Sequence, residues 1–174
     1  MSFTTSVGVL LPEIIMAVGA MVLLLAGAVG GEKTATPISW AAIGVMVLAE
    51  LAVSMGVGGP AFGGAFMADN FARYAKLLIL IGAALSVLLT EEFFAGTKQS
   101  RFELPVLIVL ATLGMMLMVS ANSFLGLYMG LELQSLALYV LAAFNRYHHE
   151  QGISARRVLP EELFHPASLD LSKV

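Results

Sequence analysis

Five long apolar segments restrict the fold of this chain more than any other feature. They cover approximately residues 7–29, 38–57, 71–89, 104–120 and 123–144. Each holds about 17–23 residues, which lets a helix cross a hydrocarbon core of about 30 Å. Because the apolar residues run continuously rather than alternating, helices are favoured over a barrel. The predicted fold class is therefore all-α, a polytopic membrane protein with five transmembrane helices.

The composition agrees with a lipid environment. Hydrophobic residues make up 59% and charged residues 12% of the 174 residues, and the mean hydropathy is +0.90. A soluble domain of this size could not bury so much apolar surface. The net charge of −3 and the lack of a basic, aromatic-rich patch argue against a nucleic-acid partner. Because the chain has no cysteine, disulfides, thiolate metal sites and cysteine nucleophiles are excluded.

The chain divides into two predicted parts. Residues 1–146 form the five-helix transmembrane domain, and residues 147–174 form a polar cytoplasmic tail that we expect to be poorly ordered. Lys and Arg are concentrated in the loops that share a side with this tail, which predicts an outside N-terminus and a cytoplasmic C-terminus. No Lys or Arg precedes the first apolar segment, so we interpret it as a retained helix and not as a signal peptide.

Two connections have distinctive compositions. The link at Ala121 and Asn122 is so short that the fourth and fifth helices must form a tight antiparallel hairpin. The stretch 56–66, GVGGPAFGGAF, is rich in glycine. No strand precedes it and no Lys-Ser/Thr pair follows it, so a phosphate-binding loop is not indicated. We predict a flexible loop at the membrane edge.

Glu132 is the one charge in the fifth apolar segment. A carboxylate within a membrane helix costs roughly 2.5–3.5 kcal/mol on insertion scales, and such residues usually have a function. Helical periodicity places Tyr128, Ser135 and Tyr139 within about 60° of Glu132, which forms a polar stripe. We predict that Glu132 handles protons or pairs with a buried charge. The alternative is a protonated carboxyl group that only stabilises packing.

The opposite face of the fifth helix carries small residues. Gly126 and Gly130 form a GxxxG pattern, and Ala137 lies on the same side. Small residues allow a neighbouring membrane helix to approach closely. This face is therefore predicted to pack against another helix.

Four further ionisable residues lie within the predicted spans. Glu50 lies in the second helix, and functional and structural interpretations of it stay open. Glu13 lies near the start of the first helix, where the helix dipole stabilises a carboxylate. Arg73 and Lys76 share one face of the third helix and are expected to snorkel to the surface. Lys76 is the deeper of the two and could also meet a carboxylate on a neighbouring helix.

The histidines do not indicate a metal site. His148 and His149 are adjacent and so do not share a helix face, and His165 has no suitably spaced partner. No metal ligands are therefore predicted.

Three stretches together resemble subunit N of bacterial NADH–quinone oxidoreductase, respiratory complex I. They are LLPEIIMAVGAMVLLL, RFELPVLIVLATLGMMLMVSAN and LYMGLELQSLALYVLAAFNR. The resemblance covers residues 1–146, and the acid within GLELQSLALYVL is its most specific feature. The family is similar to Mrp-type antiporter subunits, with fourteen helices in two inverted repeats and an outside N-terminus.

The resemblance implies a function for Glu132. In the family, the corresponding acid is half of a buried Glu–Lys pair that belongs to a proton relay coupled to quinone reduction. Tyr128, Ser135, Tyr139, Lys76 and Glu50 are possible supporting residues. The resemblance also implies that other membrane-arm subunits are partners and that the location is the cell inner membrane. The complex uses NADH and a quinone, but this chain is expected to bind no cofactor.

The chain departs from the family pattern after Arg146. The family continues into further helices that carry the partner lysine, whereas here the unrelated tail follows. We therefore predict that this chain alone translocates no protons. The alternatives are a non-catalytic membrane scaffold or an inactive truncated or frameshifted fragment. An independent small transporter is disfavoured, since five helices hold no inverted repeat.

Overall fold

The computed structural model describes residues 3–56, 58–94 and 102–150. Its elements in chain order are α1 (Phe3–Val9), α2 (Leu11–Gly30), the 3-10 helix η1 (Gly31–Thr34), α3 (Ala35–Met55), β1 (Gly59–Ala61), the 3-10 helix η2 (Phe62–Gly64), β2 (Phe66–Ala68), α4 (Asn70–Phe94), α5 (Glu103–Ser120) and α6 (Phe124–Glu150). The five helices α2 to α6 are long and apolar enough to cross a membrane. The predicted all-α class with five transmembrane helices is confirmed.

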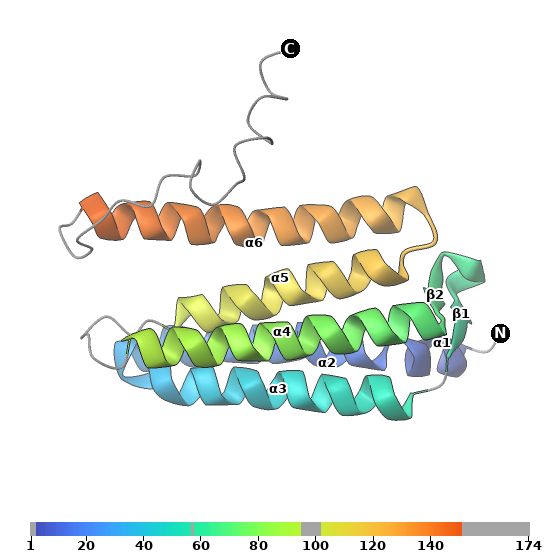
Figure 1. Cartoon of the computed structure of the whole chain (residues 1–174), viewed down its shortest axis with the longest axis horizontal. Coiled ribbons are helices and arrows are strands. Elements are labelled where there is room, and N and C mark those ends of the chain that lie inside the picture. Colours follow the sequence, from blue (N-terminus) through green and yellow to red (C-terminus); the bar gives the residue numbers. More distant parts are fainter. Residues whose placement is uncertain (1–2, 57, 95–101, 151–174) are drawn as a thin grey trace, which may run out of the picture. The chain divides into compact units, whose positions relative to one another are not determined.

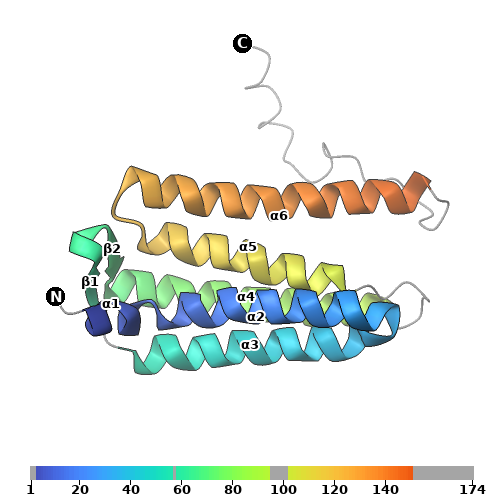
Figure 2. The same cartoon turned by 180° about the vertical axis from the view of Figure 1, so that it is seen from behind.

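Helices α2, α3, α4 and α5 form a closed bundle (Figures 1 and 2). In this ring, α2 contacts α3, α3 contacts α4, α4 contacts α5, and α5 contacts α2. The interior holds methionines and small residues, including the fully buried Met16, Ala42, Met46 and Met116. Small side chains let membrane helices approach closely, and flexible methionine fills the remaining gaps.

The glycine-rich connection between α3 and α4 contains an ordered hairpin, whereas the sequence predicted a flexible loop. Strand β1 pairs antiparallel with β2, with Gly59 opposite Ala68 and Ala61 opposite Phe66. The turn between them needs a left-handed backbone, with φ of 66° at Gly63 and 91° at Gly64. Glycine adopts these angles without a steric penalty. The glycines thus allow a tight turn.

The α5–α6 connection is bonded to this hairpin. The backbone N–H of Asn122 donates to the Ala65 carbonyl at 2.9 Å, and its side-chain amide donates to the Gly64 carbonyl at 2.8 Å. Ala121 forms a bridge with Phe66. The short link predicted between the fourth and fifth helices is confirmed, and it is held at the hairpin end of the bundle, where Figure 1 also places the start of α2.

Helix α6 continues through Glu150, which is four residues past the predicted domain boundary at 146. One compact unit comprises residues 1–137, and a second begins at Leu138 within α6. The described part of the second unit is the remainder of that helix. The rest of the predicted tail, residues 151–174, lies outside the described residues.

Candidate functional site

Glu13 and Lys76 form a buried ion pair between α2 and α4. The Lys76 Nζ lies 2.7 Å from Glu13 Oε1, and the two side chains are only 2% and 4% exposed, respectively. It is the sole ion pair among residues 3–56, 58–94 and 102–150 for which contacts are described. Charges this deeply buried are tolerated when they are paired. The pair therefore joins α2 to α4 inside the bundle.

The local sequence explains how the two charges come to the same end of the bundle. Glu13 follows Pro12 in the first turn of α2. Lys76 lies in the second turn of α4, about 9 Å along the helix from Asn70 at 1.5 Å per residue. An Asp69 carboxylate oxygen accepts a 2.7 Å hydrogen bond from the Ala72 N–H and so caps the start of α4. Both ionisable groups thus lie near the hairpin end.

The hairpin supplies an aromatic cover for the ammonium group. The Phe66 ring centroid is 4.9 Å from Lys76 Nζ. A cation at this distance from a ring face is stabilised by the ring's quadrupole. The glycine-rich segment thereby contributes directly to the charged site.

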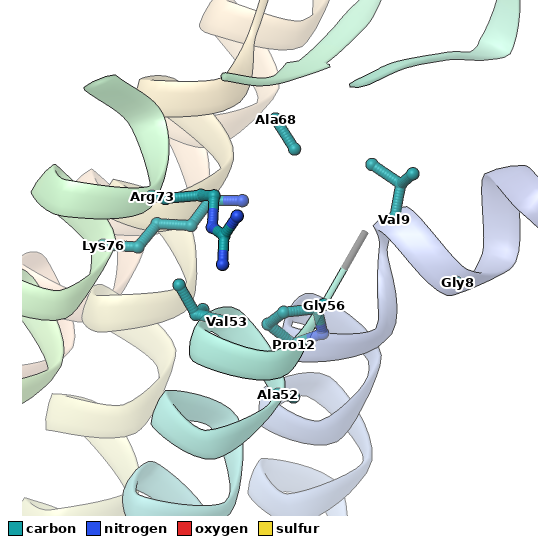
Figure 3. Close-up of a pocket in the computed structure, with 9 residues that line it drawn as sticks. All are labelled: Gly8, Val9, Pro12, Ala52, Val53, Gly56, Ala68, Arg73 and Lys76. Carbon is teal, nitrogen blue, oxygen red and sulfur yellow. The ribbon is translucent and has the colours of Figure 1, made fainter. Parts of the chain in front are cut away.

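A small pocket adjoins the pair (Figure 3). Its lining comes from α1, α2, α3, β2 and α4, and consists of Gly8, Val9, Pro12, Ala52, Val53, Gly56, Ala68, Arg73 and Lys76. In Figure 3 the nitrogen-bearing ends of Arg73 and Lys76 extend from α4 toward the last turn of α3 and the start of α2. The pocket therefore has apolar walls and two basic groups.

Arg73 closes the end of α3. Its guanidinium donates a 2.7 Å hydrogen bond to the backbone carbonyl of Ser54. This carbonyl lies in the last turn of the helix, where backbone acceptors lack partners and the dipole favours a cation. Arg73 is half-buried, so it joins α4 to α3 at the same end as the ion pair.

One sequence expectation is wrong here. Lys76 does not snorkel, because its side chain is buried and its charge is paired within the bundle. The expected position of Glu13 near the start of a helix is confirmed, since Glu13 lies in the first turn of α2. Its carboxylate also contacts Lys76. The alternative, in which Lys76 meets a carboxylate from another helix, is confirmed.

Glu132 lies apart from this pair, on α6. Its side chain is exposed on the surface of the described chain. Tyr128, one turn earlier, is 57% exposed and interacts with the Glu132 carboxylate. Ser135 is half-buried, and Tyr139 is exposed. The polar stripe is thus present on the helix, and the described residues leave most of it uncovered.

The opposite face of α6 packs as predicted. Gly130 lies so close to α5 that an added Cβ would be 2.7 Å from the Met118 side chain and 2.9 Å from the Gly114 carbonyl. A Cβ added to Gly114 would likewise lie only 2.7 Å from the backbone nitrogen of Gln134. Ala137 is buried. The contact uses glycines on both helices, whereas the sequence pattern indicated only the glycines of α6.

Comparison with known proteins reveals close relatives. No family model matches the chain. NADH-quinone oxidoreductase subunit N 1 of Rhizobium meliloti is 49% identical over 137 residues, which is 78% of this chain and 28% of that protein. The subunit N of Rhizorhabdus wittichii is 49% identical over 149 residues, 84% of this chain and 31% of that protein. That of Rhodobacter capsulatus is 48% identical over 138 residues, 78% of this chain and 29% of that protein.

The chain is a homologue of NADH-quinone oxidoreductase subunit N. The resemblance inferred from the three sequence stretches is confirmed. The chain spans about 30% of the length of the curated relatives it matches. The region described here, with its five long helices and two ionisable sites, therefore corresponds to part of the length of subunit N.

The remaining predicted residues do not join either site. Glu50 is half-buried on α3 and does not line the pocket. His165 and the side chains of His148 and His149 lie outside the described residues. The structure thus brings Lys76 together with Glu13, and Tyr128 together with Glu132.

Proposed function

We propose that this chain acts in the membrane arm of a proton-translocating NADH–quinone oxidoreductase, where Glu132 contributes a carboxylate to the proton relay. The observation that carries the proposal is the 48–49% identity, over 78–84% of the chain, to proteins named as subunit N of that enzyme. An identity of this size over a continuous five-helix region supports a shared role in the membrane.

The exposure of Glu132 supports a role that needs a partner. A carboxylate facing hydrocarbon is costly, and membrane carboxylates usually face a bundle interior, a hydrated cavity or a paired base. Tyr128 supplies one polar neighbour, while Glu132 itself is exposed among the described residues. This face is therefore suited to a further helix or subunit that carries a basic group, as the family resemblance implies.

The expected setting follows from the same resemblance. We place the chain in the bacterial inner membrane with its N-terminus outside and its C-terminus in the cytoplasm. Its partners are other membrane-arm subunits and the lipid bilayer. NADH and a quinone are used elsewhere in the complex, so this chain supplies proton-transfer groups and no redox centre.

A non-catalytic role is the second candidate. The observation that favours it is the exposed position of Glu132, because no base among the described residues pairs with its carboxylate. In this second candidate, the helices pack against other membrane subunits as a scaffold, and Glu132 carries no proton.

Purification from native membranes separates these candidates. An affinity-tagged chain, expressed from its own locus, is expected to co-purify in stoichiometric amount with NADH–quinone oxidoreductase activity. Glu132→Gln should leave the complex assembled and abolish most NADH-driven proton translocation. Glu91→Gln is the matched control, since it also neutralises an acid of a membrane-spanning helix, α4, but lies outside the polar stripe.

Each outcome is decisive. Co-purification with translocation lost only in Glu132→Gln supports the relay. Co-purification with translocation unchanged in Glu132→Gln supports the scaffold. Absence of the chain from the complex rejects both.

A further inference from the structure

We propose that the Glu13–Lys76 pair is a second proton-exchange site, which exchanges protons with water through the adjoining pocket. The ligand class is water together with the proton it carries. The physiological use of this site rests on the function proposed above, whereas its chemistry rests on the geometry of α2, α4 and the hairpin.

The pair is close enough for direct proton transfer. Lys76 Nζ and Glu13 Oε1 are 2.7 Å apart, within the range in which acid and base exchange a proton along one hydrogen bond. Both side chains are almost fully buried, so the bulk solvent competes little for that proton. A surface pair of the same length would instead exchange with water at either partner.

Glu13 has an unused hydrogen-bonding capacity. Among the described residues, no hydrogen-bond donor reaches its second carboxylate oxygen, Oε2. Buried ion pairs are stable when their remaining lone pairs are satisfied, and ordered water commonly provides the missing partner. A water held in the adjoining pocket is therefore the partner that we propose for this oxygen.

The pocket gives that water a route. Pro12, the residue before Glu13, and Lys76 itself both line it. Gly8 and Gly56 also belong to the lining and contribute no side chains to it (Figure 3). Arg73 is the other charged residue of the lining, and its guanidinium is bonded to the end of α3.

The proposed proton transfer uses water as its only co-reactant. The Nζ–H bond of Lys76 breaks as an O–H bond forms on Glu13 Oε1, which converts the ion pair into a neutral amine and a neutral carboxylic acid. The carboxylic acid then gives its proton to a water in the pocket, which becomes hydronium, and the amine accepts a proton from another hydronium ion, which becomes water. The Phe66 ring, 4.9 Å from Nζ, favours the ammonium form and so resets the pair.

Cysteine accessibility tests whether the pocket is wet. The chain has no native cysteine, so single substitutions in the full chain, in native membranes, give one reporter each. Val53→Cys, in the pocket lining, should react with a membrane-impermeant methanethiosulfonate reagent at least about 10-fold faster than Val87→Cys, because only a hydrated thiol ionises and reacts. Both valines are buried in helices, and Val87 does not line the pocket.

A plug in the pocket gives the matched comparison. An added Cβ on Gly8 meets no atom within 4 Å, and the same holds for Gly44, which is exposed and outside the pocket. Gly8→Leu should slow the reaction of Val53→Cys, and Gly44→Leu should leave it unchanged. Equal reactivity of the two cysteine reporters, or no effect of the plug, would overturn the proposal.

A paired neutral variant tests proton exchange itself. Glu13→Gln with Lys76→Met removes both charges and so leaves no orphaned ion in the bundle. At unchanged levels of assembled complex, NADH-driven proton translocation should fall about 10-fold or more. Wild-type translocation would show that the pair is only structural and would reject the proposal.

The two inferences fail in distinguishable ways. If the tagged chain is absent from the complex, the proposed function fails, and the cysteine reactivity alone decides whether the pair exchanges protons with water. If the paired variant does not assemble, the same reactivity decides. If the chain is in the complex and Val53→Cys is unreactive, the second site fails while the role of Glu132 stands.

Discussion

The Glu13–Lys76 pair and the Glu132 face place an acid in the membrane in opposite ways. Glu13 is buried against Lys76 of the same chain, and the Lys76 ammonium group lies over the Phe66 ring. Glu132 is exposed on α6, with Tyr128 as its polar neighbour. The first acid is paired within the described residues, and the second has no basic partner among them. The comparison separates an ion pair that joins two helices of the bundle from an acid that we propose to meet a partner outside the described residues.

Breaking the closed site should have the largest effect on stability. Lys76→Met leaves the Glu13 carboxylate buried and unpaired, so we expect the free energy of unfolding to fall by about 3–5 kcal/mol. The measurement is unfolding of the detergent-solubilised chain, followed by circular dichroism. The control is Glu132→Gln, which alters an exposed side chain and should change stability by less than about 0.5 kcal/mol. Equal losses in the two variants would show that the contrast between the sites is wrong.

Disturbing the packing of α6 should have the next largest effect. A Cβ on Gly114 would lie 2.7 Å from the Gln134 nitrogen and 2.8 Å from the Gly130 carbonyl. Both are backbone atoms that cannot move aside, so Gly114→Ala should cost about 1–3 kcal/mol. Gly82→Ala is the control, because its Cβ meets no atom within 4 Å, and alanine favours a helix. Stabilisation by Gly114→Ala would argue that α6 does not approach α5 this closely.

Loosening the support of Lys76 should have a smaller effect. Asp69→Ala removes the cap at the start of α4 and should lower the free energy of unfolding by about 1 kcal/mol. Asp69→Asn keeps a capping oxygen and should retain most of the stability. A larger loss in Asp69→Asn than in Asp69→Ala would contradict the capping role.

The five spans were predictable because a membrane helix must be apolar along its whole length. Residue type alone therefore marks segments such as Glu103–Ser120. The GxxxG face of α6 was predictable for a related reason, since the positions of Gly126 and Gly130 on a helix are fixed by their spacing. These features depend on local sequence.

The pairing of Glu13 with Lys76 was not predictable in the same way. It depends on the rotation and depth of two helices that are 63 residues apart along the chain (76 − 13), and periodicity within either helix fixes neither. The hairpin over Lys76 was missed because its glycines were interpreted as flexibility, whereas Gly63 and Gly64 provide the left-handed backbone of a turn. The signal that could have found the pair was a lone lysine and a lone acid near the same predicted membrane edge.

We predict that Lys76 is strongly coupled in energy to Glu13 and is not coupled to Glu132. A double-mutant cycle on the free energy of unfolding measures this directly. For Glu13→Gln with Lys76→Met, we expect a coupling of at least about 3 kcal/mol, since each single change leaves a buried unpaired charge and removing both charges restores most of the loss. For Glu132→Gln with Lys76→Met, we expect additivity within about 0.5 kcal/mol. Additivity in the first cycle, or strong coupling in the second, would contradict the assignment of the two acids to separate sites.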